Sequence, residues 1–286
     1  METNAEEGDS NTAAFFYRPL MLLLVLITTT KTTREGKLNH LQNNVPNDQP
    51  KEETVRASPP KKKKKKIYLT FDDGPNRGTR KVLSIAQQEL VPVTFFIIGE
   101  HVFASTSQHA TFDSLRIADS IELCNHSYTH AHNRYERFYR QPDSVVKDFM
   151  RCHDSLDLNN TIVRTPGRNI WRVDTLTFTD LKKSAAAADS LQKAGFTIMG
   201  WDLEWHYDHK TFTLKNRSAD LMQEIDSLFA HNRTKVPEHL VVLAHDQVYD
   251  DPDDSCELHE LIKTLKKREE YELVVASKYP GVKAPQ

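Results

Sequence analysis

Short apolar runs alternate with segments of helical periodicity from Ile67 to the end of the chain. The apolar runs predict strands at residues 67–71, 93–98, 120–124, 161–165, 196–200, 240–244 and 272–276. Apolar residues spaced three or four apart predict helices at residues 79–90, 143–156, 187–195, 218–229 and 257–268. This alternation is typical of an α/β fold with a mainly parallel sheet, either open or closed into a barrel.

Polar and charged clusters follow several of the predicted strands directly. Because active sites of parallel α/β folds form at the carboxyl ends of strands, these clusters should lie on one rim. The clusters are Asp72 with Asp73, residues 125–130, residues 164–168, residues 201–205, and His245 with Asp246. The pattern predicts one site, assembled from five separate segments.

The first 66 residues do not show the pattern of a folded domain. Residues 20–27 form a continuous apolar run with the length of a signal-peptide core, too short alone to cross a bilayer. The flanking sequence is acidic, with Arg18 as its basic residue, and no small-x-small cleavage site follows. We expect export, with residues 1–30 as a signal peptide or a retained anchor, and an extracytoplasmic location.

Residues 31–66 predict a polar linker, rich in Thr, Asn, Lys and Pro and ending in six lysines. The lysines are either solvated or hold the chain near an anionic membrane or envelope polymer. Residues 67–286 remain as the folded domain.

Composition narrows the function classes. The chain has a net charge of −2, which gives no reason to expect a nucleic-acid partner. Its three cysteines are widely spaced and form no CxxC pair. The sequence therefore indicates neither a disulfide framework nor a cysteine zinc site.

His126 and His130 are four residues apart, a spacing that brings both imidazoles to one face of a helical turn. Two histidines alone are a modest signal, but an aspartate from the same rim would complete a three-ligand site with open positions. The expected cofactor is a divalent metal ion, Zn²⁺ first, with Co²⁺, Ni²⁺ or Mn²⁺ as alternatives.

The neighbouring Asp72 and Asp73 fit such a site, because adjacent residues of an extended chain point in different directions. One carboxylate would bind the metal and the other would act as a general base. The alternative is a turn in which an aspartate of the Asp-Gly-Pro stretch bonds its own backbone.

The motifs TFDDGP, HSYTH, RTPG, WDLEW and LVVLAH occur in the order, and at roughly the intervals, of the polysaccharide deacetylases of the NodB-homology type, which the chain resembles over residues 67–280. The resemblance implies a distorted (β/α) barrel of about seven strands. It also implies metal-dependent removal of N-acetyl, sometimes O-acetyl, groups from an acetylated glycan.

Carried over by motif, the resemblance implies that Asp72 is the catalytic base and that Asp73, His126 and His130 are the metal ligands. His245 matches the general acid that protonates the departing amine; its alternative is a packed histidine at a strand end. Each of these residue types is present at its motif position.

Arg164 matches the arginine that orients the base, unless it pairs with a surface acid instead. The chain has Gly167 where the family usually has an aromatic residue that walls the sugar pocket. A glycine still supplies the backbone N–H that an oxyanion needs, so we expect altered substrate preference with the chemistry retained. Arg168 and Trp171 would rebuild a sugar platform, or Trp171 simply packs.

The WDLEW region departs from the family pattern as well. One acid there should tune His245, and the candidates are Asp202, Glu204 and Asp208. Trp201 or Trp205 would stack on a sugar or pack in the core. Two other functions stay open: a catalytically silent glycan-binding module, and an O-acetyl esterase or amidase with the same site.

Overall fold

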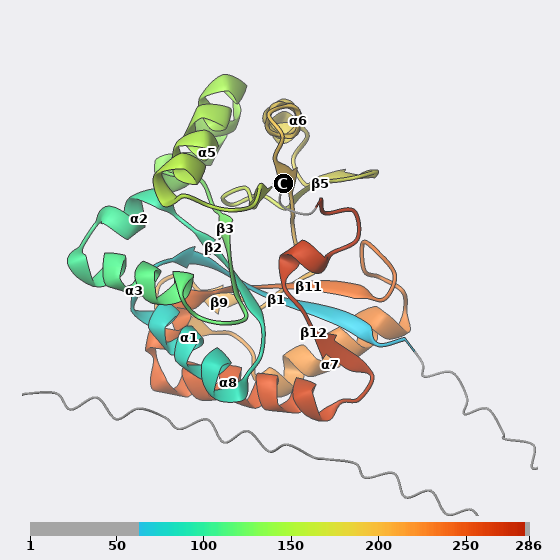
Figure 1. Ribbon diagram of the computed structural model, residues 1–286. Coiled ribbons are helices and arrows are strands. Elements are labelled where there is room, and N and C mark those ends of the chain that lie inside the picture. The colour runs from blue at the N-terminus through green and yellow to red at the C-terminus, as the bar shows by residue number, and fades with distance from the viewer. Residues whose placement is uncertain (1–62, 284–286) are drawn as a thin grey trace, which may run out of the picture. The chain divides into compact units, whose positions relative to one another are not determined.

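The computed structural model describes residues 63–283 (Figure 1). The predicted leader at 1–30 and nearly all of the predicted linker lie outside the described residues. Ten described strands form one curled, mostly parallel sheet, in the order β6-β5-β7-β4-β3-β2-β1-β11-β8, with β12 paired to β1. The strands of the sheet are β1 (Lys65–Gly74), β2 (Val93–Ile97), β3 (Ile121–Asn125), β4 (Ile162–Val163), β5 (Ile170–Val173), β6 (Leu176–Thr179), β7 (Thr197–Ile198), β8 (Leu203–Glu204), β11 (His239–His245) and β12 (Tyr271–Leu273).

All seven predicted strands are present, and the α/β class with a distorted barrel is confirmed. The described edge strands β6 and β8 do not pair, so the sheet curls without closing. The sequence analysis missed β8 and the antiparallel hairpin of β5 and β6, which have two and four residues per strand. It also missed the small antiparallel sheet of β9 (Tyr207–Asp208) and β10 (Thr213–Leu214).

Strand β1 begins two residues before the predicted start of the folded domain at residue 67. Lys65 and Lys66 belong to β1. The Lys65 amide donates to the carbonyl of Glu270, and the Lys66 amide donates to that of Glu238. Backbone hydrogen bonds therefore extend the strand to Lys65. The sequence analysis missed these two residues because their charged side chains do not continue the apolar run.

Strand β1 lies in the middle of the sheet and is buried on both faces, as parallel strands covered by helices are. Ile67, Leu69 and Phe71 join a core that also includes side chains of the covering helices. Tyr68 points the other way, into a second cluster with Phe96 on the concave side of the sheet. The alternation of side chains along an extended strand produces these two cores.

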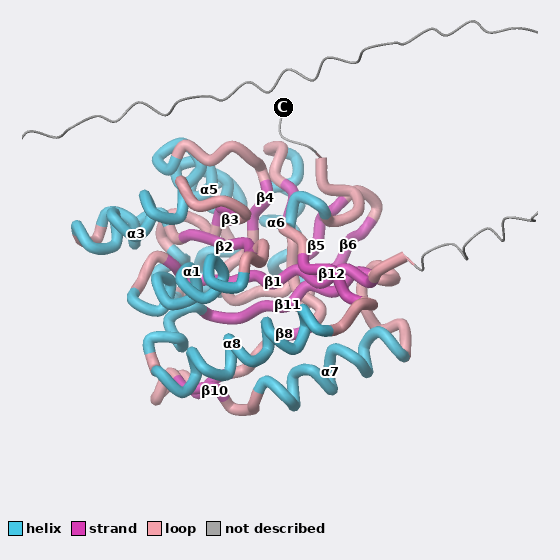
Figure 2. Tube along the Cα trace, turned by 60° about the horizontal axis from the view of Figure 1, so that its bottom comes forward, coloured by secondary structure: helices cyan, strands magenta, loops and turns pink. Residues whose placement is uncertain are grey.

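The sequence did not predict α3, which is longer than α6. Five other helices cover the sheet at the predicted positions, and Figures 1 and 2 show α1, α7 and α8 on one side and α5 and α6 on another. Each begins within a few residues of the start that apolar spacing predicts. The described α-helices are α1 (Arg77–Glu89), α2 (Gly99–Phe103), α3 (Thr106–Arg116), α4 (Tyr135–Tyr139), α5 (Pro142–Leu156), α6 (Ala185–Lys193), α7 (Ser218–Ala230) and α8 (Pro252–Lys267). Within residues 63–283, no helix has the length and apolar character needed to span a membrane.

Candidate active site

The carboxyl ends of β1, β3 and β11 open into one cavity of about 870 Å³. Register explains the convergence, since Asp72 of β1 lies opposite His245 of β11 in adjacent parallel strands. The predicted residues that line this cavity are Asp72, Asp73, His126, His130, Gly167, Trp201, Glu204 and His245. The single rim expected from the sequence therefore exists.

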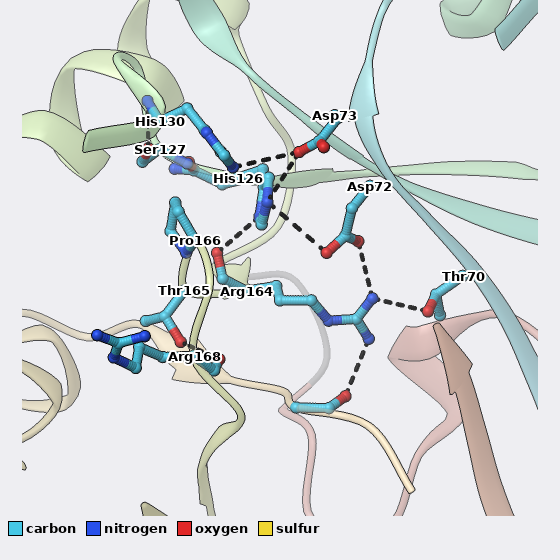
Figure 3. A network of polar contacts seen from close by, with 12 residues as sticks. Thr70, Asp72, Asp73, His126, Ser127, His130, Arg164, Thr165, Pro166 and Arg168 are labelled. Carbon is cyan, nitrogen blue, oxygen red and sulfur yellow. Dashed lines mark hydrogen bonds and ion pairs between the residues drawn. The ribbon is translucent and has the colours of Figure 1, made fainter. Parts of the chain in front are cut away.

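Asp73, His126 and His130 bring three ligand atoms together (Figure 3). Asp73 Oδ1 lies 3.4 Å from His126 Nε2 and 3.2 Å from His130 Nε2, and the three atoms all lie within 4.8 Å of one another. One carboxylate and two imidazoles are a common ligand set for a borderline divalent cation such as Zn²⁺.

The other nitrogen of His126 determines its tautomer. Nδ1 lies 2.9 Å from the carbonyl oxygen of Arg164, a partner that accepts a proton but cannot donate one. The Nδ1–H therefore donates to that carbonyl, and Nε2 is the nitrogen that faces Asp73. A histidine held in this way is oriented as a metal ligand.

Two further observations show that the trio fits a cation. Asp73 Oδ1 is buried without a hydrogen-bond partner among the described residues. Burial alone would raise the pKa of Asp73, but the adjacent His126 and His130 outweigh it and hold that pKa well below its usual range. A carboxylate kept ionised and short of donors is suited to binding positive charge.

The histidine pair converges by a route that the sequence did not predict. His126 follows β3 in extended chain, and a loop with Ser127 at φ 69° and His130 at φ 48° leads back to the site. The expectation of a helical turn is therefore corrected. Asp148 of α5 accepts the amides of Tyr128 and Thr129 and so anchors the loop. No sequence pattern indicated Asp148, because the contact joins a helix to a loop that is distant in the chain.

Asp72 is held beside the trio by Arg164. The guanidinium donates to Asp72 Oδ1 at 2.8 Å and to the Thr70 hydroxyl at 2.7 Å, and both partners of the ion pair are buried. Two backbone carbonyls, of Met199 and Gly200, accept the remaining guanidinium donors. Asp72 Oδ2 stays 3.6 Å from His126 Nε2, facing the cavity.

Gly167 reaches the cavity with φ 61°, a conformation that glycine adopts without strain. A Cβ at this position would lie 3.1 Å from the ring of Tyr135. Tyr135 also lines the cavity and stands edge-on to His130 at 5.7 Å between ring centroids. The aromatic wall that Gly167 lacks is thus supplied from α4, which the sequence did not indicate.

His245 lines the cavity, and among the described residues none of the three candidate acids is hydrogen-bonded to it. Its Nδ1 is buried without a hydrogen-bond partner among the described residues. Asp202 accepts the amides of Lys235 and Val241, and Asp208 accepts amides in its own turn. Both assignments are corrected, because these carboxylates are already engaged elsewhere.

Glu204 is the remaining candidate of that group. It lines the same cavity as His245, and its Oε1 lies 3.5 Å from His206 Nδ1. The described structure gives it no bond to His245, so its role in tuning stays a prediction.

Two of the three tryptophans are buried and therefore do not form a sugar-binding surface. Trp171 is fully buried in the concave core beside Tyr279, and Trp205 is buried with its indole N–H donated to the carbonyl of Asn216. Both took the packing alternative. Trp201 is half-buried and lines the cavity. The sequence could not separate these cases, because an indole is suited equally to a core and to a sugar face.

Asp246 follows His245 at the end of β11, and its position after a predicted strand was the only sequence feature that drew attention to it. It is buried and accepts hydrogen bonds from the side chains of Asn76 and Thr79, which tie the end of β11 to the start of α1. Burial raises the pKa of Asp246 to about 8, and the negative charges of Asp73 and Asp72 add to the effect. The carboxyl is therefore largely protonated at neutral pH.

This raised pKa predicts a pH-dependent stability. A carboxyl that titrates near 4 when unfolded and near 8 when folded binds more protons in the native state between those values, so stability falls as pH rises through that window. Asp246→Asn mimics the protonated form and should remove this component. We expect the stability advantage of the variant, measured by urea unfolding in a metal chelator, to grow by at least about 1 kcal/mol from pH 5 to pH 8.

The wild type and Asp246→Asn share every other titratable group, so the difference between their unfolding free energies reports on residue 246 alone. Asp119→Asn, an exposed position, serves as the matched control and should track the wild type at both pH values. An Asp246→Asn advantage independent of pH would contradict the raised pKa.

The comparisons with known proteins agree with this geometry. The family model for polysaccharide deacetylases matches residues 60–170, which include Asp72, Asp73, both histidines and Arg164. Over these residues the chain matches the polysaccharide deacetylase family. YheN of Bacillus subtilis, itself assigned to these deacetylases, is 26% identical over 187 residues, or 63% of this chain and 57% of that protein. The chain thus spans less than two thirds of the curated relatives it matches first.

Solved structures share the fold. A carbohydrate esterase of family 4 from Streptococcus mutans has a TM-score of 0.54 at 23% identity, covering 74% of this chain and 86% of that one. The catalytic domain of a peptidoglycan N-acetylglucosamine deacetylase from Eubacterium rectale has a TM-score of 0.55 at 19% identity, covering 81% and 98%. A pseudoenzyme of family 4 has a TM-score of 0.51 at 18% identity, covering 75% and 67%, so the fold alone does not establish activity.

Proposed function

We propose that this protein is a metal-dependent hydrolase that removes N-acetyl groups from N-acetylglucosamine-type residues of a polysaccharide. The observation that carries the proposal is the convergence of Asp73, His126 and His130 with Asp72 held beside them in an open cavity. The polymer would be peptidoglycan, a chitin-like oligomer or an exopolysaccharide. The apolar run at residues 20–27 supports our proposal that the protein acts outside the cytoplasm.

The residues around the cavity have separable tasks. Asp73, His126 and His130 would hold the cation, most consistent with Zn²⁺, which when bound supplies Lewis-acid polarisation of the acetyl carbonyl. Asp72 removes a proton from the attacking water at the oxygen that faces the cavity. Arg164 holds that carboxylate in place through its bond to the other oxygen.

The remaining steps concern the developing oxyanion and the leaving group. The N–H of Gly167 has no hydrogen-bond partner among the described residues and lines the cavity, so it can donate to an oxyanion. His245 donates a proton to the departing sugar amine, because an amide nitrogen leaves only when protonated. Trp201 and Arg168 are the remaining sugar-contact candidates.

Acetate release is the direct test of this proposal. Purified full-length protein loaded with Zn²⁺ is incubated with N-acetylglucosamine oligomers, peptidoglycan and acetylated xylan, and acetate is measured enzymatically. We expect acetate from at least one of the N-acetylated glycans. Acetate from xylan alone would indicate an O-acetyl esterase, and glycan binding without any acetate would indicate a silent binding module.

A further inference from the structure

A second depression adjoins the candidate active site on the far side of Tyr135. It has a volume of about 490 Å³ and shares Asn133 and Tyr135 with the wall of the larger cavity. Because the two hollows meet at these residues, a chain of sugars bound in the first could extend directly into the second. We call it the arginine-lined depression, after four of its lining residues: Arg134, Arg137, Arg140 and Arg168.

The charge of this depression is unusual for the chain as a whole, which carries a net charge of −2. Four guanidinium groups face one carboxylate, Glu136, which already pairs with Arg140 and Lys183 at 2.7 Å each. Among the described residues, Arg134 and Arg137 have no carboxylate within ion-pair distance, and their side chains lie on the surface. Like charges gathered around one hollow repel unless an anion joins them.

Arg168 is held in a fixed orientation at the junction. Its guanidinium lies over the rings of Tyr135 and Tyr139, 5.9 Å and 5.7 Å from their centroids, and donates to the carbonyl of Gly167 at 2.6 Å. Its Nε is buried with no hydrogen-bond partner among the described residues. A stacked arginine loses little freedom on binding and is suited to a planar carboxylate or a phosphate.

We propose that the arginine-lined depression binds a negatively charged group on the sugar next to the one that is deacetylated, so that the preferred substrate is an acidic glycan. The proposal deepens the deacetylase function and rests on it. The charged group is a sugar carboxylate or a phosphate ester, which share the geometry that paired arginines recognise.

The test compares four tetrasaccharides as substrates at low and high salt. They are N-acetylglucosamine tetramer, an N-acetylglucosamine–N-acetylmuramic acid tetramer, the same compound with its carboxylates amidated, and N-acetylglucosamine tetramer bearing a phosphate monoester. For the wild type we expect a KM at least about fivefold lower with an anionic substrate than with its neutral counterpart. The advantage should shrink in 0.5 M NaCl, because salt screens exposed charges. Whichever anionic compound shows it identifies the carboxylate or the phosphate as the group bound.

The double variant Arg134→Gln/Arg137→Gln should bring the ratio of the two KM values to about one. Arg80→Gln, an exposed arginine of α1 outside both hollows, is the matched control and should keep the wild-type ratio. An unchanged ratio in the double variant, with its unfolding midpoint preserved, would overturn the proposal.

Binding separates this proposal from the deacetylase function. Calorimetry on the Asp72→Asn protein measures the dissociation constants of the same tetrasaccharides without turnover. If no compound releases acetate from the wild type, the proposed function fails, and the binding ratio still decides whether the depression selects anions. Equal affinity for anionic and neutral compounds would end the proposal while leaving acetate release unaffected.

Discussion

Asp72→Asn should lower acetate release by about 10³-fold while bound metal is retained. The amide keeps an oxygen that can accept from Arg164, so the hydrogen bond now 2.8 Å long can persist. It cannot take a proton from water, which removes the base and little else. The measurement pairs steady-state acetate release with metal analysis of the same dialysed sample.

Asp119→Asn is the control for this variant, since it makes the same chemical change at an exposed position that lines neither hollow. It should retain wild-type rates. More than a tenth of the wild-type rate in Asp72→Asn would exclude Asp72 as the base. Loss of metal from that variant would instead make Asp72 a ligand.

His126→Ala should weaken metal binding by more than about a hundredfold and abolish acetate release with it. It removes one of three ligand atoms and also the hydrogen bond of 2.9 Å to the Arg164 carbonyl. His130→Ala removes the second imidazole from a partly exposed position, so it tests the ligand set with less disturbance of the core. Metal content after dialysis against a weak chelator measures both.

His132→Ala is a matched control in the same loop. The His132 side chain is 65% exposed and lies 3.6 Å from Glu100; it lines the cavity but is not one of the three grouped ligand residues. We expect it to keep its metal. Metal content that falls equally in all three variants would show that the loop fold, and not the ligand atoms, controls binding.

Much of the fold followed from local pattern. The continuous apolar run of β1 and the helical spacing of α1, α5, α7 and α8 were strong signals, because these elements pack apolar side chains into the core. The hairpin of β5 and β6 was missed. Strand β5 pairs with β6 and with β7, both antiparallel, and the sequence of so short a segment does not reveal such pairing. The HxxxH loop was expected to be helical because spacing alone cannot reveal left-handed residues.

The amino-acid sequence was sufficient to place the aspartate pair, the two histidines, the arginine and His245 at strand ends. Residues that directly follow parallel strands lie at the same edge of the sheet, so their positions along the chain predict that they share one site. Tertiary structure alone decided that Tyr135 fills the wall beside Gly167, that Trp171 packs inside, and that arginines gather next to the site. Those outcomes depend on contacts between distant segments, which compete for the same space and are settled only when the whole core packs.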